Sequence, residues 1–274
     1  QNSLSNNGTH WIGTISGEAD ETVNIDAYDP AGNLGENNSV NYTIDDTKPV
    51  FSGFNSNASF NIIRSDTAII FTAEASDNYL REVQIENKSS SGFEDMVNIS
   101  GTYTLDTTPS ALGLNQEQPY NMTAEAIDEA ENTGKAYYEL TIDDTAPSIT
   151  QVTLNDAVVS SNTTITVNAS VSDQHLNNVY ANNQLMSDNG NEWTAEINVN
   201  SSTQNPVNLS ALDKASNYAE DLSAVYTIDD IKPTINEFSV NVSEQIARSD
   251  AAVKFAANVS DPNLRDVELN GSAM

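Results

Sequence analysis

The chain has 274 residues, of which 40 are acidic and 10 are lysine or arginine, and its formal net charge is −30 at pH 7. This charge excludes nucleic acids and anionic membrane surfaces as partners, because both are bound through clustered lysine and arginine. Two interpretations remain: the acidic side chains bind divalent cations, or they keep the surface solvated in a salty medium.

The tetrapeptide Thr-Ile-Asp-Asp occurs three times, at 43–46, 141–144 and 227–230, and a proline follows each copy three residues later. Each copy ends a run in which apolar and polar residues alternate. A strand that runs into two acidic residues and a proline predicts the end of one β domain and the linker to the next. The prolines are 98 and 86 residues apart, which is the size of one small β-sandwich per repeat.

The predicted elements begin with the later half of a repeat, in residues 1–47. An aromatic strand covers Trp11–Ile15, and an alternating strand covers Val23–Ala27. A turn at 29–33, with proline and glycine, precedes the strand that carries the first Thr-Ile-Asp-Asp. We therefore predict that residues 1–47 form the C-terminal half of a domain.

Two complete domains are predicted next, at 48–145 and 146–231. Each opens with a short strand and continues with an alternating strand that places its apolar residues on one face. Each contains six or seven short strands and no convincing helix. The shared elements are alternating strands around Phe71 and Val167, aromatic strands at 103–105 and 193–197, alternating strands at 122–126 and 207–211, and turns at 128–132 and 213–217.

Residues 232–274 repeat only the early half of a domain, with an alternating strand at Val253–Val259 and a further strand at Leu264–Leu269. Two interpretations stay open for the two half-domains. Either the chain is a window in a longer tandem array, or residues 1–47 of a neighbouring chain complete the domain begun by residues 232–274, head to tail. In both cases unpaired halves expose strand edges and apolar faces.

The turn and linker sequences resemble those of a known family. Residues Ala27–Asn33 are similar to an Ala-x-Asp-x-Ala-Gly-Asn turn, and Ile142–Pro147 are similar to a Val-Asp-Thr-Thr-Ala-Pro linker. Both are typical of the tandem immunoglobulin-like repeats of bacterial and archaeal surface proteins, of the adhesin and S-layer-associated type. The resemblance covers the whole chain and implies an all-β fold of tandem immunoglobulin-like β-sandwich domains. The chain departs from antibody domains because it has no cysteine pair.

Acidic residues gather at the predicted domain junctions. In an immunoglobulin-like sandwich, the loop after the second strand and the loop before the last strand lie where the chain enters the domain. Their aspartates would therefore meet the incoming linker and offer Ca²⁺ the hard oxygen ligands it prefers. The alternative is that each aspartate only bonds the backbone of its own turn. The candidate ligands are Asp45, Asp46, Asp77, Asp128, Asp143, Asp144, Asp173, Asp213, Asp229, Asp230 and Asp261.

Asparagine is unusually common, with 36 residues, and 14 of them begin an Asn-X-Ser/Thr sequon. Chance would give roughly half that number, so we expect N-glycosylation. The alternative is an asparagine-rich polar face that meets serine and threonine by chance. The strand pattern places five acceptors on outward faces: Asn41, Asn121, Asn168, Asn208 and Asn258.

Catalysis finds little support, and we expect no enzyme. The two histidines, His10 and His175, lie in unrelated loops outside any repeatable triad or metal-ligand pattern. The aromatic residues Trp11, Tyr103 and Trp193 begin equivalent strands, so we expect them in the cores and not in a sugar-binding platform.

We therefore predict a structural repeat array on the extracellular surface of a prokaryote, an archaeon, with linkers stiffened by calcium. The absence of cysteine fits a prokaryotic surface protein, and no apolar run is long enough to insert directly into a membrane. The expected partners are neighbouring copies of the same array. Two alternatives remain: an adhesin module that binds a glycan or protein, for which the longer stretch 87–118 is the candidate, and accessory domains of a larger surface enzyme.

Overall fold

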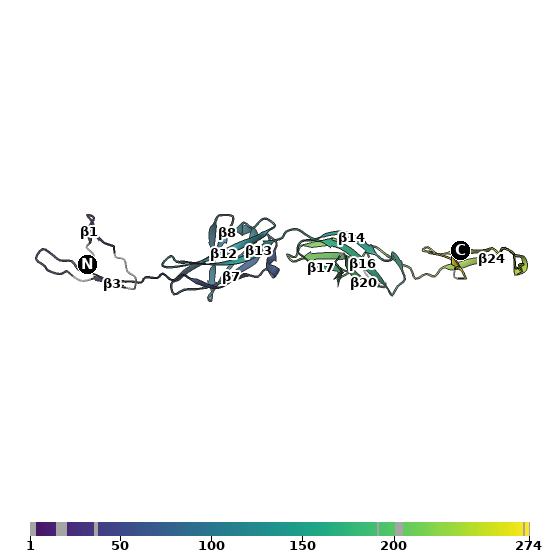
Figure 1. Cartoon of the computed structure of the whole chain (residues 1–274), viewed down its shortest axis with the longest axis horizontal. Helices are drawn as coiled ribbons and strands as arrows, with labels where there is room; N and C mark the ends of the chain where they lie inside the picture. The colour runs from purple at the N-terminus through teal and green to yellow at the C-terminus, as the bar shows by residue number, and fades with distance from the viewer. Residues whose placement is uncertain are drawn as a thin grey trace. The chain divides into compact units, whose positions relative to one another are not determined.

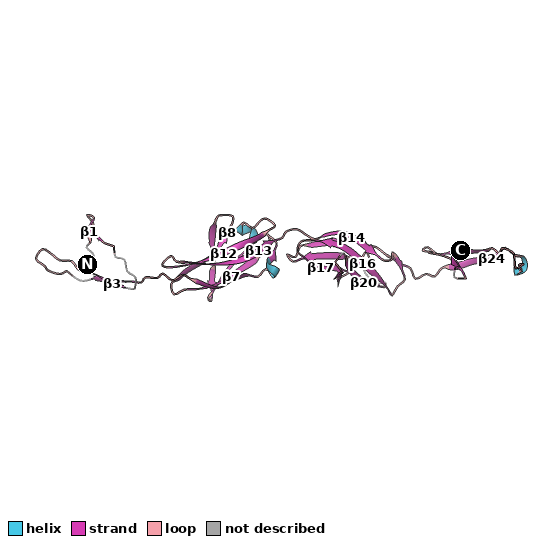
Figure 2. Cartoon of the chain, in the orientation of Figure 1, coloured by secondary structure: helices cyan, strands magenta, loops and turns pink. Residues whose placement is uncertain are grey.

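The computed structural model describes residues 4–14, 21–35, 38–190, 192–200, 205–270 and 272–273. It divides into two compact units, 1–143 and 144–274, drawn in Figure 1. In the described residues, strands alternate with loops, and the only helices are three short 3₁₀ turns (Figure 2). The predicted all-β fold is therefore confirmed. No helix in this part of the chain has the length and hydropathy that a membrane span requires.

The first unit contains a β-sandwich of two sheets. One sheet has the order β10-β11-β7-β5, and the other has the order β6-β13-β12-β8-β9. Neighbouring strands are antiparallel, except that β6 runs parallel to β13. The strands are β5 (Val50–Ser56), β6 (Ile62–Ile63), β7 (Ile69–Ser76), β8 (Leu80–Asn87), β9 (Gly92–Asp95), β10 (Val97–Ile99), β11 (Thr102–Thr107), β12 (Pro119–Asp128) and β13 (Thr133–Ile142).

Alternation along the strands builds the core between these sheets. Ile69 and Phe71 of β7 are fully buried, as is Met122 of β12. Phe54 stacks on Phe71 at a centroid distance of 6.1 Å, and the ring of Tyr138 lies edge-on to both. The faces that the period-two pattern predicted as apolar therefore form one continuous core, whose burial is the main favourable contribution to folding.

The second unit contains a second β-sandwich. Its larger sheets have the orders β14-β16-β20-β19 and β18-β17-β21-β22, and a short parallel pair joins β15 to β23. Its core includes Ile165, Val167 and Leu209, all fully buried. The strands are β14 (Ser148–Leu154), β15 (Val158–Val159), β16 (Thr163–Ser172), β17 (Leu176–Ala181), β18 (Gln184–Leu185), β19 (Ser187–Asp188), β20 (Trp193–Val199), β21 (Leu209–Asp213), β22 (Tyr218–Asp221) and β23 (Thr227–Ile228).

Among the described residues before 48 and after 231, the strands form separate two-stranded ladders. The strands are β1 (Ser5–Asn6), β2 (Trp11–Ile12), β3 (Glu21–Ile25), β4 (Asn38–Tyr42), β24 (Thr234–Val240), β25 (Phe255–Ser260), β26 (Glu268–Leu269) and β27 (Ser272–Ala273). They pair as β1 with β2, β3 with β4, β24 with β25 and β26 with β27. Neither of the two core clusters includes residues from these segments. The three boundaries between the four predicted segments stay a prediction.

Three sequence-based details differ from the structure. Trp11 is 65% exposed instead of buried, whereas Tyr103 and Trp193 pack against their cores. The predicted strand at Leu264–Leu269 is limited to Glu268–Leu269, because the described residues near it provide no counterpart of β12, with which β8 pairs. The strand at Trp11 ends at Ile12, and Ile15 lies outside the described residues.

Candidate metal site

The turn that precedes the last strand of each repeat has one conformation, repeated three times. In Asp128–Asn132, Asp128 Oδ1 accepts hydrogen bonds from the backbone N–H groups of Ala130 and Asn132, both at 2.8 Å. Asn132 Nδ2 donates to Asp128 Oδ2 at 2.9 Å. The fourth residue, Glu131, has a positive φ of 66°. The same position is Gly32 in the first turn and Ser216 in the third, both also at positive φ.

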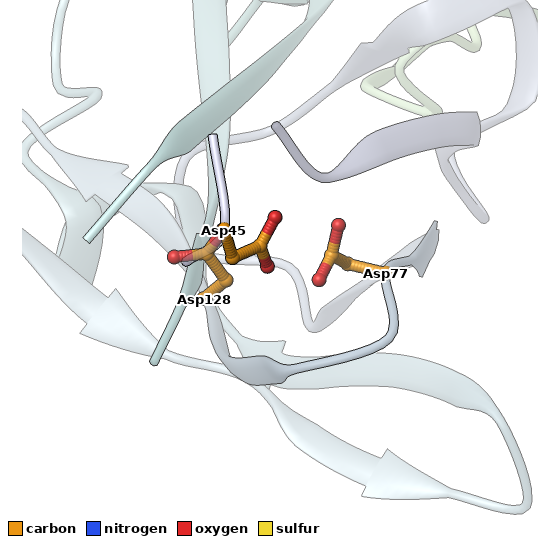
Figure 3. A group of neighbouring side chains, drawn as sticks. All are labelled: Asp45, Asp77 and Asp128. Carbon is orange, nitrogen blue, oxygen red and sulfur yellow. The ribbon is translucent and has the colours of Figure 1, made fainter. Parts of the chain in front are cut away.

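This turn places one aspartate of the candidate site. Figure 3 shows Asp45, Asp77 and Asp128 approaching one another, and each offers a carboxylate oxygen within 4.8 Å of the other two. Asp45 belongs to the incoming linker, Asp77 to the loop after β7, and Asp128 to the end of β12. Asp128 is fully buried, while Asp45 and Asp77 are half-buried. The structure thus unites three residues that sequence reasoning placed together from three distant segments.

Local hydrogen bonds orient the carboxylates of Asp45 in the linker and Asp77 in the loop after β7. Asp45 Oδ1 accepts from the N–H of Thr47 at 2.9 Å, and Asp77 Oδ1 accepts from the N–H of Tyr79 at 2.8 Å. These are Asx turns, in which an aspartate bonds backbone two residues further on. In Figure 3 the two carboxylates point toward one another. The turn role and a ligand role are compatible, because each turn engages only one of the two carboxylate oxygens.

The linker is held against the domain by two contacts that the sequence did not reveal. Asn132 Nδ2, besides bonding Asp128, donates to the backbone carbonyl of Asp45 at 2.8 Å. At the start of β13, a Cβ added to Gly134 would lie 2.0 Å from the backbone oxygen of Pro49. Only glycine allows the linker to approach this closely. A glycine inside an alternating strand was the available signal, because it often marks close backbone approach.

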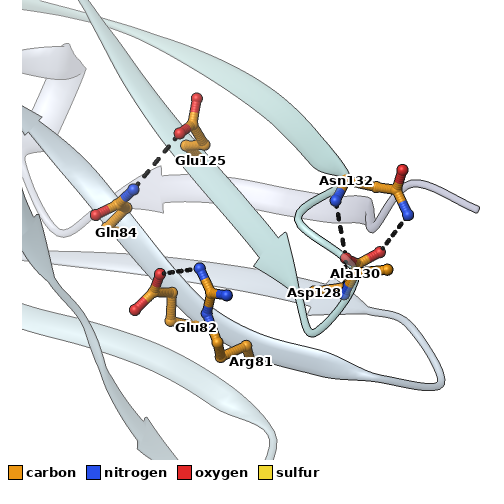
Figure 4. A network of polar contacts seen from close by, with 7 residues as sticks. All are labelled: Arg81, Glu82, Gln84, Glu125, Asp128, Ala130 and Asn132. Carbon is orange, nitrogen blue, oxygen red and sulfur yellow. Dashed lines mark hydrogen bonds and ion pairs between the residues drawn. The ribbon is translucent and has the colours of Figure 1, made fainter. Parts of the chain in front are cut away.

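Asp128 is kept ionised despite its position. Burial acts to raise the pKa of Asp128, but the hydrogen bonds from Asn132 and Ala130 and the nearby guanidinium of Arg81 outweigh it, so the pKa is lowered from 3.8. Figure 4 shows these bonds and also shows Arg81 donating to Glu82, at 3.1 Å. Asp128 therefore contributes a negative charge to the group at neutral pH.

The donor set matches the chemistry of Ca²⁺. This ion takes about six to eight hard oxygen ligands at about 2.3–2.6 Å, from mono- or bidentate carboxylates, carbonyls and water. Three carboxylates supply up to six oxygens and three negative charges, and no cysteine or histidine competes for a softer metal. Without a cation the same carboxylates repel one another. The residues present therefore fit a calcium ion shared by the linker and two loops.

The second unit repeats the loop geometry. Asp213 accepts from the N–H of Asn217 at 2.9 Å and from its Nδ2 at 2.7 Å, and Asp173 Oδ1 accepts from the N–H of His175 at 2.6 Å. Asp143, which the sequence pairs with them, is the last residue of the first unit, where its N–H donates to Ile63 O at 3.1 Å. Asp173 and Asp213 thus correspond in sequence and local bonding to Asp77 and Asp128.

A third acidic pair lies near the end of the second unit. Asn263 joins the two residues, because its Nδ2 donates to Asp229 Oδ2 at 2.8 Å and its N–H donates to Asp261 Oδ1 at 2.7 Å. The bond from Asn263, with a second from the N–H of Ile231, lowers the pKa of Asp229 from 3.8. Asp261 Oδ2 is buried and has no hydrogen-bond partner. Both aspartates line a pocket of about 290 Å³.

The second acid of each Thr-Ile-Asp-Asp copy is placed differently from the first. Asp46, Asp144 and Asp230 are exposed, whereas Asp45 and Asp229 are half-buried and Asp143 is buried. Asp230 Oδ1 accepts from the N–H of Ser161 at 2.8 Å, so it has a local structural role. None of the three belongs to a carboxylate group found among the described residues. The sequence did not distinguish the two aspartates of a copy, and both were predicted as metal ligands.

The predicted glycosylation sites differ in accessibility. Asn41, Asn121 and Asn258 are exposed, and Asn168 and Asn208 are half-buried. Asn168 Oδ1 accepts from Thr194 Oγ1 at 3.0 Å, and Asn208 Nδ2 donates to Glu220. Glycosylation stays a prediction, and at Asn208 the Nδ2 that would carry the glycan is the atom that donates to Glu220.

No protein-family model matches the sequence, and no curated protein matches it. Several solved structures resemble the chain. Fibronectin(III)-like modules of CbhA from Clostridium thermocellum share 13% identity over 63% of this chain and 90% of theirs, with a TM-score of 0.41. A 1.5-MDa bacterial ice-binding adhesin shares 16% identity over 72% of this chain and 70% of its own, with a TM-score of 0.37. A Ca²⁺-stabilised adhesin that helps an Antarctic bacterium bind ice shares 18% identity over 81% of this chain and 60% of its own, with a TM-score of 0.38. At these scores the similarities assign no ligand or role to this chain.

Proposed function

We propose that this chain is a structural repeat array of an extracellular cell surface, a stalk, fibre, sheath or surface-layer component, whose domain junctions are stiffened by calcium. The observation that carries the proposal is the convergence of Asp45, Asp77 and Asp128 from a linker and two loops of the domain that follows it. An ion bound there ties the incoming chain to the sandwich. A structural role of this kind predicts one such site at every domain junction, whereas a catalytic role would predict a single site in the chain.

Repetition along the sequence supports the structural role. Asp143, Asp173 and Asp213 occupy the positions of Asp45, Asp77 and Asp128 one repeat later. We propose that the carboxylates of Asp173 and Asp213 in the second unit bind calcium as well. The third repeat contains the corresponding Asp229 and Asp261. Groups that recur with the domain period fit a mechanical function, because every junction of an array bears the same load.

The extracellular location is part of the same proposal. Free calcium is abundant outside cells, and sites of modest affinity suffice there. The high frequency of sequons and the absence of cysteine agree with a prokaryotic surface glycoprotein. The archaeal source predicted from the sequence belongs to this proposal as well.

Scattering tests the stiffening directly. Small-angle X-ray profiles of the full chain would be recorded in calcium and in excess chelator, for the wild type, for Asp77→Asn and for the exposed control Asp106→Asn. We expect calcium to narrow the distance distribution of the wild type and the control. Asp77→Asn should keep a broader distribution in calcium. Identical profiles for all three proteins in both buffers would contradict the proposal.

One observation favours a second candidate function, partner binding through the first repeat. The stretch 87–118 supplies β9 and β10, which lie at the edges of the two sheets. Phe93, Val97 and Ile99 of these edge strands are 40%, 64% and 59% exposed. Exposed edge strands with apolar side chains accept an added strand from a partner. Binding of the full chain to a cell-surface fraction that is lost in Val97→Lys, and retained in Tyr137→Lys, would support this role.

A further inference from the structure

The two sandwiches build one of their sheets in the same register, so its residues can be compared position by position. Strand β8 pairs with β12 as β17 pairs with β21, with the same register shift near the start of β8 and of β17. β9 and β18 extend this sheet on one side, and β13 and β22 extend it on the other. The N–H of Met96 donates to Val83 O, and the N–H of Met186 donates to Val179 O. These bonds identify Leu185 as the counterpart of Asp95.

The outward face of this sheet differs between the two sandwiches. In both, outward residues alternate with buried ones, such as Val179 and Ala211 in the second. Three of six outward positions are charged in the first sandwich, whereas one of the six is charged in the second. The residues of the first sandwich are Gln84, Asp95, Glu125, Ile127, Thr133 and Lys135. The counterparts in the second, in the same order, are Tyr180, Leu185, Ser210, Leu212, Tyr218 and Glu220.

The charged face of the first sandwich is paired within itself. Lys135 Nζ lies 2.7 Å from Glu125 Oε2, and Gln84 Nε2 donates to Glu125 Oε1 at 3.5 Å, a bond drawn in Figure 4. The first sandwich thus folds with ionic and polar groups at these positions. The fold therefore does not require aromatic or apolar residues there.

The same positions of the second sandwich carry large apolar side chains in contact with solvent. Leu185 is 57% exposed and Tyr218 is 52% exposed, while Tyr180 and Leu212 are half-buried. Tyr180 lies directly opposite Leu185 across the sheet, and Leu212 lies directly opposite Tyr218. Apolar side chains that gather on one exposed face mark a surface used for binding.

Polar groups lie among these side chains. Ser210 is paired with Tyr180 on one side and with Glu220 on the other. Within the described part of the chain, the hydroxyl groups of Tyr180, Ser210 and Tyr218 form no hydrogen bond to another residue. The two tyrosines are on strands separated by one strand and are offset by two residues, which places them about 12 Å apart. This is the dimension of a short oligosaccharide.

The size and charge of the face decide between occupants. Four strands about 4.8 Å apart, with the outward positions about 7 Å apart along each, give an area of about 200 Å². A stable protein partner or a second copy needs about 800 Å² on each side. A second copy would also bring its own net charge of −30. A small neutral ligand needs neither a large area nor opposite charges.

We infer that the outward face of the β18-β17-β21-β22 sheet binds a neutral saccharide, a short stretch of a pyranose polymer. The apolar face of a sugar ring stacks on Tyr180 or Tyr218, and its hydroxyl groups bond to Ser210 and Glu220. This gives the second repeat a binding role that the first repeat lacks. It does not rest on the proposed calcium function, because it uses none of the candidate metal ligands.

Affinity electrophoresis of the full chain tests this binding. Native gels would contain mannan, dextran, galactomannan or hydroxyethyl cellulose, all neutral polymers, and the net charge of −30 makes the chain migrate. The chain would be produced in a host that adds no N-glycans, because the predicted acceptor Asn208 donates to Glu220 at the border of the face. At least one polymer should slow the wild type.

Two matched pairs of variants locate the site. Tyr180→Ala and Tyr218→Ala should each raise the apparent Kd for that polymer about tenfold. Gln84→Ala and Thr133→Ala change the counterpart positions of the first sandwich and should leave the Kd unchanged. Far-ultraviolet circular dichroism checks folding, and Tyr218→Ala, at the more exposed tyrosine, decides if Tyr180→Ala does not fold.

Two results would overturn the inference: no polymer slows the wild type, or both tyrosine variants bind like the wild type. A wild type that no polymer slows, but that forms dimers lost in Tyr218→Ala during sedimentation, would assign the face to a second copy instead. Asp77→Asn should bind the polymer as the wild type does. Failure of the calcium function would therefore be seen separately from failure of saccharide binding.

Discussion

The β5–β7 ladder of the first sandwich and the β24–β25 ladder near the other end of the chain are two copies of one element, since residues 49–83 and 233–267 are identical at 16 of 35 positions. Their bulges, 3₁₀ turns and pairing registers agree, although only β5–β7 is covered by a second sheet. Local structure in these repeats is therefore set by short-range signals. One such signal is an asparagine bridge: Asn57 Oδ1 accepts from the N–H of Ile70, and Asn241 Oδ1 accepts from that of Lys254. Burial, in contrast, depends on the later half.

The largest effect expected from this comparison is at the paired phenylalanines. Phe71→Ala removes a fully buried ring and should cost about 3–5 kcal/mol of unfolding free energy for the first sandwich. Phe255→Ala, at a residue 40% exposed, should change the free energy of unfolding much less. Denaturant unfolding of the two variants, followed by far-ultraviolet circular dichroism, which reports on the strands of both ladders, measures the difference. Equal losses would mean that the β24–β25 face is buried in solution.

A smaller effect is expected where the linker meets β13. Gly134→Ala forces a methyl group against the carbonyl of Pro49 and should cost about 1–3 kcal/mol. Gly53→Ala is the control, since its Cβ would approach no atom closer than 3.7 Å. Thermal unfolding in chelator compares the two without a contribution from bound calcium. A Gly134→Ala protein as stable as the control would show that the linker is not held at this point.

The smallest expected effect is on how the stability of the first sandwich falls at acidic pH. Because the folded pKa of Asp128 lies below its ordinary value of 3.8, the unfolded chain takes up this proton first as pH falls. The stabilisation by Asp128 is thus fully present above about pH 4 and is lost as pH falls through its folded pKa. In chelator, Asp128→Asn should flatten the fall of the unfolding midpoint between pH 5 and pH 3. Asp106→Asn should keep the wild-type dependence of the unfolding midpoint on pH. If the wild type and both variants show the same dependence, the lowered pKa of Asp128 in the folded chain is contradicted.

Much of the fold could be predicted from the sequence because its signals are local. Period-two alternation identified the core faces around Phe71 and Val167, and the Asp-to-Asn turns identified the start of each last strand. Residues that share a position need not share an environment, so Trp11 could not be placed. Its counterpart Tyr103 packs on a core that the described residues around Trp11 do not form.

The candidate site was predictable in outline for the same reason. Fold topology brings the linker and two loops to one end, which is how Asp45, Asp77 and Asp128 could be grouped. The choice of Asp45 over Asp46 depends on how the chain leaves β4 and enters β5, and no pattern in the tetrapeptide encodes it. Gly134 inside an alternating strand signals a close backbone approach, but its partner Pro49 lies far away in the chain, so a single sequence could not identify it.

Calcium binding by the carboxylates of Asp45, Asp77 and Asp128 is the central claim, and isothermal titration of the full, chelator-treated chain tests it most directly. The wild type and Asp106→Asn should bind the same number of calcium ions per chain, and Asp77→Asn should bind one fewer. If Asp77→Asn binds as many ions as Asp106→Asn with the same affinity, or if the wild type binds none, the three carboxylates serve only their turns.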